Sequence, residues 1–79
     1  MKKYSDLLKS GREIVVIDNT NEYCDSAIFW YSNYEKCYYS FNRSMGILER
    51  PDMTDDRFNQ HMENMKKEDA SIFVRGYRD

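Results

Sequence analysis

The stretch from Ser26 to Asn42 constrains this chain more than any other, because its pattern predicts two β-strands joined by a tight turn. It holds the only Trp, two of the four Phe and four of the seven Tyr. Large rings bury much area per residue at little rotamer cost, so even 79 residues can form a core around this hairpin. We therefore expect one domain over residues 1–79, without a linker or a second domain.

The two strands of this hairpin differ in their alternation. Residues 27–32 are apolar in both alternating sets, which is the pattern of a central strand. In residues 36–43 one alternating set is apolar and the other is more polar and expected to face solvent. The more polar set includes Tyr38. We expect a core platform for a helix, formed by Trp30, Tyr39 and Phe41, with either Ile28 or Phe29.

The position of the predicted turn decides whether the two cysteines can form a disulfide. A two-residue turn at Asn33-Tyr34 would place Cys37 opposite Trp30 and leave Cys24 beyond its strand. A disulfide between the two cysteines would then require a turn inside the aromatic strand. Free thiols in a reducing compartment are therefore expected.

The rest of the chain supplies further elements around the hairpin. Residues 5–11 predict a short helix, residues 13–18 a β-branched strand, and residues 71–75 a last strand. Residues 46–49 could add a brief extension to the sheet. The expected fold is α+β, with an antiparallel sheet of about four strands in the order α-β-β-β-α-β. The last strand could pair at either edge or beside the first strand.

One longer helix is predicted after Thr54, which is a good N-cap. Phe58, Met62 and Met65 recur at helical spacing and form an apolar stripe that should pack on the sheet. His61 borders this stripe.

No catalytic or metal motif is evident. Any Cys–His mechanism would need His61, the only His, together with Cys24 or Cys37, and a His at the border of a helix is more commonly structural. We expect a non-enzymatic protein without a cofactor or a metal. Helix N-termini favour acidic residues, which accounts for the carboxylates of Asp52, Asp55 and Asp56.

Charge argues against a general phosphate-backbone binder, because the formal net charge is −2. The segment from Glu13 to Glu35 contains five acidic residues, both ends included, and no Lys or Arg. Neither a long apolar run nor a signal peptide is present, so a cytoplasmic location is expected. The acidic segment of residues 13–35 favours a partner protein with a basic surface.

Tyr side chains with acidic neighbours near hairpin turns predict a protein-binding surface, because Tyr is a favoured hot-spot residue and acids steer basic partners. The predicted partner-binding residues are Asp18, Glu22, Tyr23, Asp25, Tyr34, Glu35 and Tyr38.

These features together predict a small protein-interaction module that binds a larger basic host protein. In size and build the chain is similar to the small inhibitors that phages and mobile elements use against host defence nucleases, anti-CRISPR proteins among them. That resemblance implies an inhibitor that blocks a basic nucleic-acid-binding surface. A homodimer is also compatible with an exposed edge strand.

The alternative is a nucleic-acid-binding or transcription-regulating module. It would use basic residues near both termini, which must converge on one face for such a site to form. These residues are Lys2, Lys3, Lys9, Arg12, Arg75 and Arg78.

Overall fold

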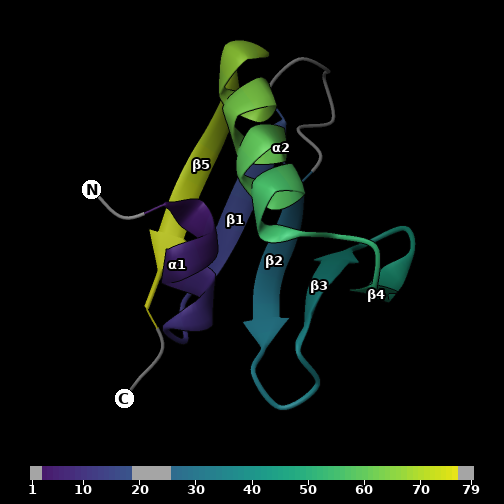
Figure 1. The fold of residues 1–79 in the computed structure, drawn as a ribbon. Coiled ribbons are helices and arrows are strands. Elements are labelled where there is room, and N and C mark those ends of the chain that lie inside the picture. The colour runs from purple at the N-terminus through teal and green to yellow at the C-terminus, as the bar shows by residue number, and fades with distance from the viewer. Residues whose placement is uncertain (1–2, 19–25, 77–79) are drawn as a thin grey trace.

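The computed structural model describes residues 3–18 and 26–76, which form a five-stranded antiparallel sheet and two helices (Figure 1). The elements are α1 (Tyr4–Lys9), β1 (Glu13–Asp18), β2 (Ser26–Ser32), β3 (Cys37–Asn42), β4 (Gly46–Arg50), α2 (Asp55–Lys67) and β5 (Ala70–Arg75). The α+β class and the antiparallel sheet are confirmed. The sheet has one strand more than expected, because residues 46–50 form a full strand.

The strand order is β4-β3-β2-β1-β5, with β2 in the centre. The last strand pairs with β1 at one edge of the sheet, which is one of the positions that the sequence left open. Both helices lie on one face, over β5, β1 and β2 (Figure 1). We call this the covered face and the opposite side the open face.

The core lies between the covered face and the helices, where Phe58 is central. Its ring stacks on Tyr38 with centroids 5.0 Å apart and meets Phe29 edge-on at 5.6 Å. These contacts join α2 to β2 and β3. The buried apolar residues of the core are Leu8, Ile14, Val16, Phe29, Tyr38, Phe58 and Met62.

The start and the apolar stripe of α2 agree with prediction. The Thr54 hydroxyl accepts a hydrogen bond from the Arg57 backbone N–H at 3.1 Å, as an N-cap does. Phe58 and Met62 are fully buried and Met65 packs against the core from its margin. The predicted stripe is therefore confirmed.

The short helix α1 is held against α2 by side chains. The Asn59 side chain accepts from the Ser5 backbone N–H at 2.9 Å and donates to the Ser5 hydroxyl at 2.9 Å. One turn earlier in α2, Asp55 binds the Lys9 ammonium at 2.6 Å. A helix of six residues is too short to persist alone, so these tertiary bonds stabilise it.

The predicted two-residue turn is wrong. The strands are joined by residues 33–36, with Lys36 at a φ of 61° and its N–H bonded to the Ser32 carbonyl at 2.7 Å. Cys37 therefore pairs with Ser32, and Trp30 pairs with Tyr39. The Ser32 hydroxyl accepts a bond from the backbone N–H of residue 35 at 3.0 Å, which stabilises the longer loop.

Of the predicted core platform only the alternative member Phe29 is correct, because the helices cover its face and not the face of the other members. Trp30, Tyr39 and Phe41 lie on the open face, whereas Tyr38, expected on a wet face, is only 2% exposed. The register explains this result. Phe29 of β2 pairs with Ile14 of β1, which is buried under the helices, so Phe29 and every second residue from it along β2 face the helices.

The hydroxyl of the buried Tyr38 side chain has a charged hydrogen-bond partner. Its hydroxyl donates to Asp55 at 2.6 Å, and the same carboxylate binds Lys9. Burial raises the pKa of Tyr38, and the bond to Asp55 raises it further. The ion pair with Lys9, followed by the Tyr38 bond, lowers the pKa of Asp55.

The position of the core predicts a difference between two neighbouring aromatic residues. Phe29→Ala should reduce the free energy of unfolding by about 3–5 kcal/mol, since it removes a buried ring. Trp30→Ala should cost less than half as much, because Trp30 is only half-buried on the open face. Urea denaturation of both variants tests this order. A larger loss for Trp30→Ala would contradict the assigned faces.

Tyr38 should make stability pH-dependent in alkali. The unfolded tyrosine loses its proton near pH 10, while the folded one, with its raised pKa, keeps it, so stability should fall above that pH. Tyr38→Phe should remove this part of the pH dependence and cost about 1–2 kcal/mol at neutral pH. Urea denaturation at neutral pH and at alkaline pH measures both effects. Tyr34→Phe is the control: Tyr34 is 93% exposed, so the wild-type pH dependence should remain.

Candidate functional site

The open face of the sheet carries one continuous row of apolar side chains. Paired residues of neighbouring antiparallel strands point to the same face, so the register places one residue from each strand in this row. From the β5 edge to the β4 edge, the apolar row consists of Phe73, Val15, Ile28, Phe41 and Ile47.

The outer members of the apolar row are well exposed. Ile47 is 64% exposed, Phe73 51% and Phe41 36%, while Val15 and Ile28 are half-buried between their neighbours. No helix or strand formed by residues 3–18 and 26–76 covers this face (Figure 1). Single exposed apolar residues are ordinary on protein surfaces, but a contiguous apolar patch marks an interaction site.

A second row beside the apolar row is aromatic in the middle and charged at its ends. Trp30 stacks on Tyr39 with ring centroids 5.7 Å apart and an interplanar angle of 5°. On β4, Glu49 pairs with Tyr39, and at the other end Arg75 of β5 forms an ion pair with Glu13. This charged row therefore ends in a cation at the β5 edge and in a carboxylate at the β4 edge.

The carboxylate end includes the one group of potential metal ligands found in the described part of the chain. Ligand atoms of Glu35, Cys37 and Glu49 lie within 4.8 Å of one another. The Tyr39 hydroxyl already donates to Glu35 and lies 3.5 Å from Glu49. Partial burial, followed by both carboxylates, raises the pKa of the Cys37 thiol, which disfavours the thiolate that metal binding or nucleophilic attack requires.

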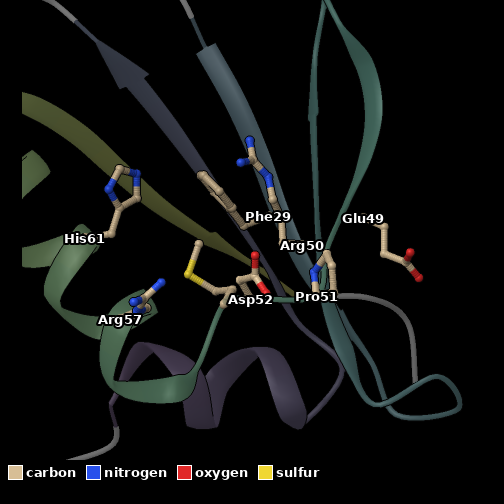
Figure 2. Close-up of a pocket in the computed structure, with 8 residues that line it drawn as sticks. Phe29, Glu49, Arg50, Pro51, Asp52, Arg57 and His61 are labelled. Atoms are coloured by element: carbon tan, nitrogen blue, oxygen red, sulfur yellow. The ribbon is translucent and has the colours of Figure 1, made fainter.

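The covered face has a groove between α2 and β4. Its larger cavity, of about 530 Å³, has Phe29 between His61 of α2 and Arg50 of β4 (Figure 2). Asp52 and Arg57 also line it, so charges of both signs surround an aromatic floor. A second cavity of about 400 Å³ shares Phe29 and His61 with the first, which extends the groove along the helix.

The groove does not contain a Cys37–His61 pair. His61 borders the cavity on the covered face, where its ring meets Phe29 edge-on at 6.0 Å. Cys37 shares the open face with Tyr39 and Phe41, two and four residues along β3. The sheet therefore separates the thiol from the imidazole, and this dyad is excluded.

The four predicted partner-binding residues that the structure describes do not lie together in one site. Tyr34 and Glu35 are exposed in the β2–β3 loop, whereas Asp18 is half-buried at the opposite end of the sheet. Tyr38 is a core residue, so its assignment to the contact surface is wrong. Three other predicted residues, Glu22, Tyr23 and Asp25, lie outside the described residues.

Sequence reasoning missed the apolar row as a candidate site. The signal was present, since residues 27–32 are apolar in both alternating sets. That pattern predicts a central strand, which β2 is, but it does not say which of the two faces the helices cover.

Comparison with known proteins gives this chain no relative: no family model, curated protein or solved structure matches it. Neither of the described helices is long and apolar enough to cross a membrane.

Proposed function

We propose that this chain is a non-enzymatic protein-interaction module whose contact surface is the open face of the sheet. One observation carries the proposal: the apolar row crosses all five strands and remains exposed at Ile47, Phe73 and Phe41. Burying such a row against another protein removes apolar surface from water, which is the main favourable term in association.

The charges around the open face support a protein partner over nucleic acid. Stacked aromatic residues on an open sheet can bind bases, but the Trp30–Tyr39 pair is flanked by the carboxylates of Glu35 and Glu49. These carboxylates would repel phosphates.

The alternative basic patch receives little support. Two of its described members are already paired, Lys9 with Asp55 and Arg75 with Glu13. Lys2 and Arg78 lie outside the described residues.

The finer proposal is an inhibitor that binds a basic surface of a larger cytoplasmic host protein, such as a nucleic-acid-binding enzyme. It is supported by the β2–β3 loop, where Tyr34 is 93% exposed beside Glu35, next to the Glu49 end of the charged row. An exposed Tyr with neighbouring carboxylates can anchor on such a surface and steer its approach.

Substitution of the exposed ends of the apolar row should separate binding from folding. The double variant Ile47→Ser with Phe73→Ser should lower partner binding at least about tenfold while leaving the fold intact, because both side chains are more than half exposed. Affinity capture with quantitative mass spectrometry, followed by titration of the captured partner, measures this loss.

The matched control is Met45→Ser, since Met45 is 65% exposed but lies outside the apolar row. It should bind as the wild type does. Equal binding by the double variant and the wild type would refute the open face as the contact surface. Random-sequence RNA and DNA at low salt complete the comparison, and binding that weakens with salt would favour the nucleic-acid alternative.

A further inference from the structure

We propose that the open face binds a second copy of this chain, face to face, about a twofold axis that lies between the two sheets and runs along β2. This inference rests on the proposed function, because it takes the open face as the contact surface and names its partner. It follows from the strand order and from the charges at the two edges of the sheet.

The strand order suits such an axis, because β2 is central with two strands on each side. A twofold axis along β2 places β2 on the partner's β2, β1 on β3 and β5 on β4. The apolar row then packs on the partner's apolar row in the opposite order of strands. Phe73 faces the partner's Ile47, Val15 faces the partner's Phe41, and Ile28 faces its own copy. Aligned packing of two twisted sheets is the arrangement found in β-sandwiches.

The same axis brings opposite charges together at both edges. Arg75 stands at the β5 end of the charged row and Glu49 at the β4 end, so each Arg75 faces the partner's Glu49. Arg75 is 60% exposed although it pairs with Glu13, and its guanidinium has five N–H donors, enough for a second carboxylate. Glu49 is exposed, with only long contacts to Tyr39 and Cys37.

An axis across the strands would not produce this complementarity. It would place β4 on β4 and β5 on β5, and the charged row would face the opposite end of the partner sheet. At that end the strands present Ile17, Ser26 and Ser71, so Arg75 would face no carboxylate of the described strand residues, while Glu49 would lie toward Arg43 of the β3–β4 turn. Of the two axes, the one along β2 is therefore the one that places both Glu49 and Arg75 opposite a partner of opposite charge.

The size of the face sets the expected affinity. Five strands at a spacing of about 4.8 Å, each about 17 Å long, project roughly 400 Å² per chain. The two chains together would bury roughly 800 Å², which is below the range of stable specific interfaces, so we expect a weak dimer that dissociates in the high-micromolar range.

Charge reversal at the two positions tests the inference. Glu49→Arg alone and Arg75→Glu alone should each weaken the dimer at least about tenfold, since each creates two like-charge contacts. An equimolar mixture of E49R and R75E should recover dimerisation, because both contacts are attractive only in the mixed dimer. Sedimentation velocity from about 1 μM to about 500 μM covers the expected dissociation range.

Two controls separate dimerisation from folding. Glu63→Arg changes an exposed acid on α2, across the sheet from the open face, and should leave the dissociation constant unchanged. Circular dichroism and thermal melting should show that E49R and R75E are folded, which matters for R75E because it loses the pair with Glu13.

The outcomes distinguish this inference from the proposed function. A wild type that stays monomeric at the highest concentration, or a dimer that the charge variants do not affect, overturns the homodimer. If the Ile47/Phe73 double variant still loses another protein partner, the proposed function stands without the homodimer. If the wild type is monomeric and that variant binds the partner normally, both fail.

Discussion

The packing of Phe58 against Phe29 and Tyr38 is the interaction on which the rest of this structure depends. It fixes which face of the sheet the helices cover. The two helices formed by residues 3–18 and 26–76 cover only part of one face, over β5, β1 and β2. The aromatic side chains of the other alternating set must then lie on the open face, where Trp30 stacks on Tyr39.

This arrangement divides the aromatic residues into two groups with different energetic roles. Phe29 and Tyr38 lose most of their contact with water on folding, so their burial stabilises the folded state. Phe41 and Phe73 keep a third to a half of their surface in water, so they contribute less to folding and retain more apolar area for association. Binding can therefore be altered on the open face at small cost to the fold.

Much of the fold could be predicted from the sequence, whereas the choice of covered face could not. The Thr54 cap and the Phe58 stripe are local patterns, and both predictions are correct. The choice of face is not local: residues 27–32 are apolar in both alternating sets, and Tyr38 can be read as core or surface. The bond from Tyr38 to Asp55, 17 residues away, is a tertiary contact that neither local pattern contains.

The candidate site was less predictable, since the apolar row exists only after register brings five strands together. The predicted loop residues Tyr34 and Glu35 nevertheless fit the proposed dimer. An axis along β2 keeps equivalent strand ends together, so both β2–β3 loops lie at the same end of the dimer. Two linked copies of the Tyr34–Glu35 pair raise each other's effective concentration on a partner protein. The homodimer and the host-binding hypothesis are therefore compatible, because in such a dimer the open face would join the two copies and the paired loops would face a third protein.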